Sequence, residues 1–298
     1  MYKEDPKQGG LEGRNISFSQ NFLKDSDYVS SLIDKTSIGT QDLVVEIGPG
    51  KGIITQQLAR RARKVIGVEL DPNLAKELKS MFSGTENVNV VQADFLKWNL
   101  PEEPYKVFAN IPFNMTADII NKLLVAKNPP DATYLIIQDN AAARFIGPPQ
   151  GPISQASIQL QPFYEMAVIS KIDRKQFTPV PNVDVVMAKF EQKREPDINP
   201  QQRQLYRDFV VYGYNQWKPT LLQAFKSVFS GKQLDIMDRN LKLGNLKPSE
   251  VDVNQWVGMF DVFVKLVPQD KKILIIGSEG NLKNKQSGMK KQYRTRRR

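Results

Sequence analysis

Residues 110–113 read Asn-Ile-Pro-Phe, a combination that could act on an amino group attached to a planar ring. The side-chain oxygen of Asn110 and the main-chain oxygen of Ile111 could both accept hydrogen bonds from such an amine and direct its lone pair at an electrophile. Pro112 would restrict the turn, and Phe113 could stack on the ring. The tetrad therefore indicates transfer to the exocyclic amine of a nucleobase extruded from its strand, with an Asx turn capped by a buried Phe113 as the alternative.

Three closely spaced glycines, Gly48, Gly50 and Gly52, could hold the group donor, because a residue without a Cβ lets the backbone turn sharply against a ligand. The apolar run at residues 42–47 predicts a buried parallel strand, and the spacing over 53–63 predicts a helix. A strand, a glycine turn and a helix form the nucleotide-binding corner of a doubly wound sheet. The spacing is not that of a dinucleotide fold, and a tight turn without a ligand is the alternative.

Carboxylates follow the next two predicted strands, at residues 64–69 and 87–92. Glu69 comes about twenty residues after the first glycine, where a carboxylate can accept both hydroxyls of a ribose. Asp94 could accept from an exocyclic amine, and Phe95 could form an aromatic wall beside a purine. The strand ends would then hold, in order, the methionine part, the ribose and the adenine of a cofactor, and we include Leu70 among the candidate contacts.

Two further segments could border the same cleft. The proline-rich segment 177–184 could hold Phe177 on the cleft rim, where its ring would cover the second face of the base. Near the N-terminus, Gln20, Asn21 and Phe22 precede a predicted helix. They could lie across the cofactor pocket or could form only a hydrophobic staple.

Strands and helices alternate from residue 17 to residue 192, which predicts an α/β fold: a Rossmann-like domain with a mostly parallel, seven-stranded sheet. Asp25 or Ser26 should cap the first helix, Asp71 and Pro72 should start the next one, and further helices should begin at Thr116 and at Ala141. The remaining strands are expected at residues 105–109, 132–138, 163–172 and 183–190, the last two forming the antiparallel edge that closes such sheets. Because parallel strands end on one side, the tetrad and the glycine turn should face one crevice.

Helical periodicity replaces the strand pattern after Pro196. We expect helices at residues 201–214, 219–229, 233–243 and 253–266. We therefore divide the chain into a flexible segment (1–16), a catalytic domain (17–192), a helical RNA-binding domain (193–270) and a basic tail (271–298). Basic and aromatic residues of the helical domain could contact RNA: Arg203, Arg207, Tyr214, Trp217 and Lys218. An apolar island at 274–276 has no explanation in the pattern.

Composition limits the chemistry. The 298 residues include no cysteine and no histidine, which excludes disulfides, thiol nucleophiles, the usual zinc sites and imidazole bases, and we expect no metal. No run approaches the roughly 18 apolar residues of a membrane span, so we expect a cytoplasmic protein without membrane contact. We also expect a monomer. The formal charge is +10, and the basic run after Glu279 suits phosphate contacts, although it could be only a solvated tail.

Several motifs together resemble one family. SQNFL, EIGPGKG, VIGVELDP, QADFL, NIPFNMT and FTPVPNVDV occur between Ser17 and Lys189 in an order similar to the rRNA adenine N6-methyltransferases, most closely the erythromycin-resistance (Erm) family. The resemblance implies an enzyme that uses S-adenosyl-L-methionine to methylate an adenine of 23S rRNA near the peptidyl transferase centre. The methyl groups would obstruct macrolides, lincosamides and streptogramin B. It also implies cofactor contacts from these residues: Asn21, Leu23, Gly48, Glu69, Asp94 and Asn110.

The nearest rival is an enzyme of the KsgA type, which dimethylates small-subunit rRNA. That type more often has N-L-P-Y at the tetrad, so Ile111 favours the Erm family, part of which also has phenylalanine at the position of Phe113. Three more classes of protein are compatible with parts of the pattern: a DNA adenine methyltransferase, a non-catalytic RNA-binding or transcription factor on the same scaffold, and a nicotinamide oxidoreductase.

Overall fold

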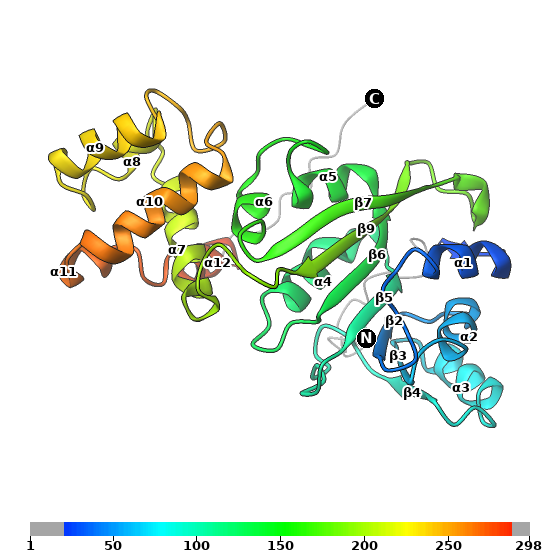
Figure 1. Cartoon of the computed structure of the whole chain (residues 1–298). Helices are drawn as coiled ribbons and strands as arrows, with labels where there is room; N and C mark the ends of the chain where they lie inside the picture. The colour runs from blue at the N-terminus through cyan, green and yellow to red at the C-terminus, as the bar shows by residue number, and fades with distance from the viewer. Residues whose placement is uncertain (1–20, 288–298) are drawn as a thin grey trace, which may run out of the picture. The chain divides into compact units, whose positions relative to one another are not determined.

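The computed structural model describes residues 21–287, so the predictions for Gln20, for segment 1–16 and for the end of the basic tail lie outside the described residues. Figure 1 shows the chain. It forms two compact units, which we describe separately. Among the described residues, the first unit comprises 21–138 and 169–187, and the second unit comprises 139–168 and 188–287.

The chain contains a seven-stranded sheet with the order β4-β3-β2-β5-β6-β9-β7. The strands are β2 (Leu43–Ile47), β3 (Lys64–Glu69), β4 (Val88–Gln92), β5 (Lys106–Asn110), β6 (Ala132–Gln138), β7 (Tyr164–Ile172) and β9 (Val185–Gln192). From β4 to β6 each neighbouring pair is parallel. Every residue of β2 is buried, as its apolar run predicts. The predicted α/β fold is confirmed, including the edge position of β9 and β7.

The described part of the first unit contains four α-helices: α1 (Ser26–Ile33), α2 (Ile53–Ala59), α3 (Pro72–Met81) and α4 (Thr116–Leu124). The carboxylates of Asp25 and Asp71 cap α1 and α3 by accepting from main-chain N–H groups. Helix α2 ends at Ala59, four residues before the predicted end. The side-chain amide of Asn87 donates to the carbonyls of Ala59 and Ala62, which satisfies groups that a longer helix would have used.

A small antiparallel sheet, which the sequence did not predict, joins β1 (Phe22–Leu23) to β8 (Phe177–Thr178). Leu23 is paired with Phe177. Both side chains are buried in the hydrophobic cluster that also contains Val44 and Tyr134, and Phe177 is fully inaccessible. The expected position of Phe177 on the cleft rim is therefore wrong, because strand pairing directs its ring into the core.

The second unit is largely helical. Its helices are α5 (Asp139–Ile146), α6 (Gln155–Leu160), α7 (Arg203–Tyr214), α8 (Leu221–Ala224), α9 (Gly231–Leu241), α10 (Val253–Leu266), α11 (Gln269–Lys272) and α12 (Ser278–Ser287). Aromatic rings form its core: Phe209 lies 4.6 Å from Phe225, 6.0 Å from Trp256 and 5.1 Å from Phe263, measured between ring centroids. Such pairs bury large apolar areas and hold α7 against α10.

A helix, α12, lies in the region where only a basic tail was expected. Arg207 of α7 donates to both carboxylate oxygens of Glu279, at 3.0 and 2.6 Å, and both side chains are buried. Asp208 accepts from the main-chain N–H groups of Gly277 and Glu279 at the start of α12. Within the apolar island before it, Ile275 is fully buried. Residues far apart in sequence thus hold this helix in place.

Candidate active site

Four of the predicted site residues follow or end adjacent strands on the carboxyl side of the sheet. Asp94 comes after β4, Glu69 ends β3, Gly48 follows β2 and Asn110 ends β5. Main-chain hydrogen bonds fix neighbouring ends, since Ala93 donates to the Glu69 carbonyl at 2.8 Å and Gly48 donates to the Val68 carbonyl at 3.0 Å. The residues predicted to contact adenine, ribose, methionine and the target base therefore follow one another along the sheet in that order.

The glycine turn needs glycine for conformation and for space. Gly48, Gly50 and Gly52 have φ angles of +65°, +58° and +79°, in the left-handed region. A Cβ at Gly50 would lie 2.7 Å from the Phe22 ring. The N–H of Gly50 donates to Glu69 Oε2 at 3.0 Å, and the N–H of Asp71 donates to Oε1 at 2.9 Å. The turn and the Glu69 carboxylate therefore hold each other in position.

Glu46, in the strand before the turn, is a buried acid. Its side chain is 1% exposed, and Thr55 donates to its Oε2 at 2.6 Å. Burial raises the pKa of Glu46 to about 8, and the nearby Glu69 carboxylate adds to this increase, although the Thr55 hydrogen bond opposes it. A pKa of about 8 means that Glu46 is mostly protonated at neutral pH.

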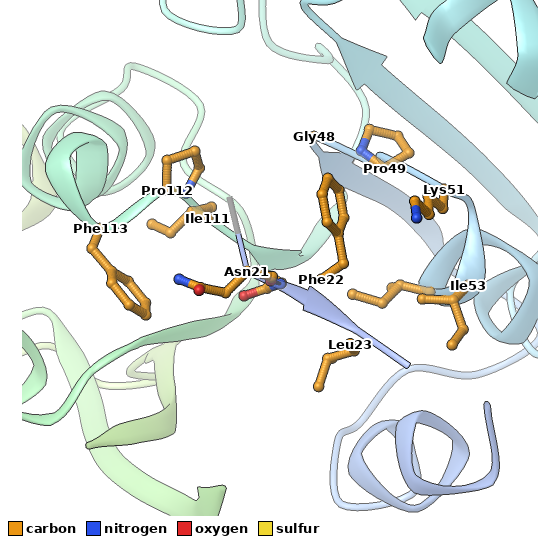
Figure 2. A pocket seen from close by; sticks show the side chains of 12 residues that line it. Asn21, Phe22, Leu23, Gly48, Pro49, Lys51, Ile53, Ile111, Pro112 and Phe113 are labelled. Carbon is orange, nitrogen blue, oxygen red and sulfur yellow. Dashed lines mark hydrogen bonds between the residues drawn. The ribbon is translucent and has the colours of Figure 1, made fainter. Parts of the chain in front are cut away.

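One pocket joins the glycine turn to the tetrad (Figure 2). It is lined by Asn21, Phe22, Leu23, Gly48, Pro49, Lys51, Ile53, Ile54, Asn110, Ile111, Pro112 and Phe113. In the view of Figure 2, Phe113 lies on one side of Asn21, and Phe22 and Lys51 lie on the other. In this view Asn21 therefore lies between two aromatic rings, those of Phe113 and Phe22.

The Asn110 amide is oriented by the chain itself. Its Nδ2 donates to the Asn21 carbonyl at 2.7 Å, so its Oδ1 is the atom that can accept from a substrate amine. Asn21 belongs to the segment that continues into β1, so this bond links the N-terminal segment to the end of β5. The tetrad continues into a 3-10 turn, Phe113–Met115, where the Thr116 hydroxyl donates to the Phe113 carbonyl at 3.1 Å.

The predicted site residues fall into three groups. The pocket brings together Asn21, Leu23, Gly48, Asn110, Ile111, Pro112 and Phe113. Gly50 and Glu69 are hydrogen-bonded to each other but do not line it, Leu70 is 38% exposed, and the Asp94–Phe95 loop follows β4 at the same edge of the sheet. Phe177 is in the core and does not line the pocket.

Phe22, which the sequence suggested could lie across the pocket, does line it, whereas sequence reasoning missed four lining residues: Pro49, Lys51, Ile53 and Ile54. All of them lie within or directly beside the SQNFL and EIGPGKG segments, so their neighbours carried a signal. Nothing local indicated that the Phe22 ring would cover Gly50, because that contact requires β1 to pair with β8.

Two features are absent from the described part of the chain. Among residues 21–287, no group of three or more acidic side chains is arranged to hold a metal ion. In the same part of the chain, no helix is long and apolar enough to cross a membrane.

The sheet order, the glycine turn and the tetrad define an α/β methyltransferase. A sequence model of the family described as "Ribosomal RNA adenine dimethylase" matches residues 12–265. The chain therefore belongs to this family, the rRNA adenine N6-methyltransferases.

Relatives of two types are similar to the chain. The ribosomal RNA small subunit methyltransferase A of Alkaliphilus metalliredigens is 31% identical over 239 residues, which cover 77% of this chain and 83% of the relative. The rRNA adenine N-6-methyltransferase of Saccharopolyspora erythraea is 34% identical over 193 residues, covering 65% and 50%. The crystal structure of the 23S rRNA methyltransferase ErmE superimposes with a TM-score of 0.73 at 27% identity, covering 82% of this chain and all of that one.

A dimethyladenosine transferase from Plasmodium falciparum has the same fold, with a TM-score of 0.69 at 22% identity, and the match covers 82% of this chain and 97% of that one.

Proposed function

We propose that this protein uses S-adenosyl-L-methionine to methylate N6 of one adenine in 23S rRNA near the peptidyl transferase centre. The product would obstruct macrolides, lincosamides and streptogramin B. One observation carries the proposal: the amide of Asn110 and the glycine turn line the same pocket. A methyl acceptor held by the first could therefore meet a donor held by the second. We further propose that it acts in the cytoplasm as a monomer.

The residues at the strand ends suit this cofactor. The left-handed glycines leave the main chain of the turn open, and an added Cβ at Gly48 would meet no protein atom within 4 Å, so the space beside it is free. The Glu69 carboxylate is fixed by two main-chain donors, yet each oxygen can accept a further hydrogen bond, as a ribose would require. Gly48, Glu69, Asp94 and Asn110 would hold the cofactor, with Asn21 and Leu23 beside them. When bound, it supplies an electrophilic methyl group.

The chain itself would supply orientation. The exocyclic nitrogen of adenine is a weak nucleophile because its lone pair is delocalised into the ring. Asn110 Oδ1 and the Ile111 carbonyl would accept its two hydrogens and localise the pair toward the methyl group. Phe113 would stack on the flipped base. No general base is assigned, since the methylated ammonium is acidic enough to lose its proton to water.

This mechanism differs from the one predicted from the sequence, in which the Phe177 ring covers the second face of the base. Phe177 is fully buried, so it is not assigned to the base. Its role is to pack under β1 and thereby support the Asn21 carbonyl that orients Asn110.

Two observations favour 23S rRNA as the substrate. The N-I-P-F tetrad is closer to the Erm pattern than to the KsgA pattern, and the structure of ErmE matches along its whole length. The rival substrate, small-subunit rRNA, is favoured by the similarity to the Alkaliphilus small-subunit methyltransferase, which covers 83% of that relative.

The test is to incubate the purified protein and labelled cofactor separately with unmodified 23S rRNA and with unmodified small ribosomal subunits, and then to map the methylated nucleotide. Label in 23S rRNA, together with macrolide resistance in a host carrying the gene, is the expected result. Label confined to the small subunit would replace the proposal by its rival. Label in neither would reject both.

A further inference from the structure

Trp217, in the loop between α7 and α8, is an outlier in exposure. Its side chain is 95% exposed, whereas Trp256 is fully buried in the aromatic core of the same unit. Tryptophan is among the largest apolar side chains, and leaving it in water sacrifices the stabilisation that burial would give. The exposure of Trp217 therefore does not serve folding.

The same residue is an outlier in backbone conformation. Its φ angle is +53°, a left-handed conformation that a bulky residue rarely adopts and that glycine or asparagine would tolerate. Strain at a residue that makes no contribution to the core indicates that its side chain has another role.

Both ends of the loop that carries Trp217 are held by contacts to the rest of the unit. Before it, Asn215 donates to the Val211 carbonyl at 2.7 Å, and the Tyr214 ring stacks on Trp256 at 5.6 Å with an interplanar angle of 14°. After it, Leu221 donates to the Leu246 carbonyl at 2.9 Å. Trp217 is thus an exposed ring on a loop with fixed ends, which lowers the entropy lost when a ligand binds.

The sequence around Trp217 is basic. Residues 209–234 include Lys218, Lys226 and Lys232, all exposed, and contain no aspartate or glutamate. A hydrogen bond of 2.9 Å between Tyr212 and Ser227 holds the segment next to Lys226 against the last turn of α7, close in sequence to Trp217. An exposed aromatic ring followed directly by an exposed lysine, as in Trp217-Lys218, offers the stacking face and the positive charge that single-stranded nucleic acid binds.

Other residues that the sequence suggested for RNA are used inside the unit. Arg207 is paired with Glu279, and the Arg203 guanidinium lies 4.7 Å from the centroid of the Phe163 ring. Tyr214 is held against Trp256. Of the five residues named for RNA contact, Trp217 and Lys218 are the exposed ones.

We propose that Trp217 stacks on an unpaired base of the rRNA substrate, with Lys218 contacting the adjoining phosphate. The site would anchor the RNA outside the catalytic pocket. This inference rests on the proposed function for the nature of the RNA but concerns binding rather than methyl transfer.

The test measures binding of the full chain, without cofactor, to a transcript of unmodified 23S rRNA, at two salt concentrations. Trp217→Asn removes the ring and keeps a residue that tolerates positive φ, so its melting temperature should not fall, while its affinity should fall about tenfold or more. Trp217→Tyr keeps a stacking face and should bind close to wild type. Leu266→Ala, a control that removes another exposed apolar side chain of the unit (63% exposed), should bind as wild type.

Lys218→Gln should reduce the dependence of affinity on salt, as expected when one phosphate contact is lost. Wild-type affinity in Trp217→Asn, or equal losses in Trp217→Asn and Leu266→Ala, would overturn the inference. Because the assay contains no methyl donor, a protein that binds RNA through Trp217 but methylates nothing would disprove the proposed function and leave this inference standing. The reverse result would disprove the inference alone.

Discussion

The ammonium group of Lys122, on α4, lies 2.6 Å from the main-chain oxygen of Phe95, in the loop after β4. It also donates to the Trp98 carbonyl and lies 5.0 Å from the centroid of the Phe95 ring. Burial lowers the pKa of Lys122, an effect that nearby Asp94 opposes. One lysine therefore connects the helix after the tetrad to the loop proposed to hold the adenine of the cofactor.

Lys122→Met should weaken cofactor binding about tenfold, because hydrogen bonds from a charged group stabilise a structure by roughly 1.5–3 kcal/mol and here they hold the loop in place. The measurement is calorimetric titration with S-adenosyl-L-methionine. Lys97→Met is the matched control, since Lys97 is in the same loop but its side chain is 85% exposed and its nitrogen is 4.0 Å from Asp94. Equal affinities in the two variants would show that Lys122 has no role in the cofactor site.

Asn110→Ala should lower the rate of methyl transfer by at least about 100-fold, the typical cost of removing one acceptor or donor that acts in the transition state. Cofactor affinity should change less than the rate. Single-turnover kinetics on rRNA, with equilibrium cofactor binding measured in parallel, separates the two effects. A matched control is Asn128→Ala, which removes an amide that bonds the Pro101 and Glu102 carbonyls on the surface. Near-normal turnover in Asn110→Ala would remove the proposed mechanism.

Glu46 should make stability depend on pH. Its pKa is about 8 in the folded chain against an ordinary value of 4.5, so between these values the unfolded chain loses a proton that the folded chain keeps. The contribution is complete below pH 4.5 and declines as the pH rises toward 8.

Glu46→Gln, which mimics the protonated acid, should remove this decline. Urea unfolding at pH 5 and pH 8 measures the difference between the wild type and the variant. The control is Glu103→Gln, an exposed acid paired with Arg63 on the surface. If the wild type and Glu46→Gln lose the same stability between the two pH values, Glu46 is not protonated in the folded chain.

Arg207→Ala should destabilise the second unit by about 3–5 kcal/mol, because Glu279 would remain buried without its partner. Burial alone would raise the pKa of Glu279, but Arg207, Lys283 and Gln204 outweigh it and lower the pKa to about 2. Stability from this pair should therefore persist above the ordinary pKa of 4.5 and be lost as the pH falls toward 2.

Urea unfolding measures the loss, and Lys265→Ala, which breaks an exposed pair with Asp261, should cost less than about 1 kcal/mol. The double variant Arg207→Met with Glu279→Leu should recover much of the stability, since both charges are removed together. A loss no larger in Arg207→Ala than in Lys265→Ala would mean that the buried pair does not hold α12.

Local sequence was sufficient for much of the fold and part of the site. The strand at 132–138 was predicted to the residue, and β5 within one residue at each end, because β-branched and aromatic runs bounded by turn residues leave few other conformations. The glycine turn could also be predicted from local sequence, since residues other than glycine rarely adopt its left-handed φ angles. Placing Gly48 and Asn110 at one edge required only that parallel strands end on the same side.

Other contacts of the site and the core depend on pairing between distant segments, and only the tertiary structure shows them. β1 pairs with β8 across more than a hundred residues, which buries Phe177 and places Phe22 over Gly50. The position of Arg207 also depends on a distant segment. Its sequence context suggests an RNA contact, but its partner is Glu279 on another helix. The sequence by itself determines which functional groups are present, because these depend only on the atoms of each side chain. Which residues meet depends on the surfaces that the folded chain brings together, because burial and pairing energies are properties of the whole core.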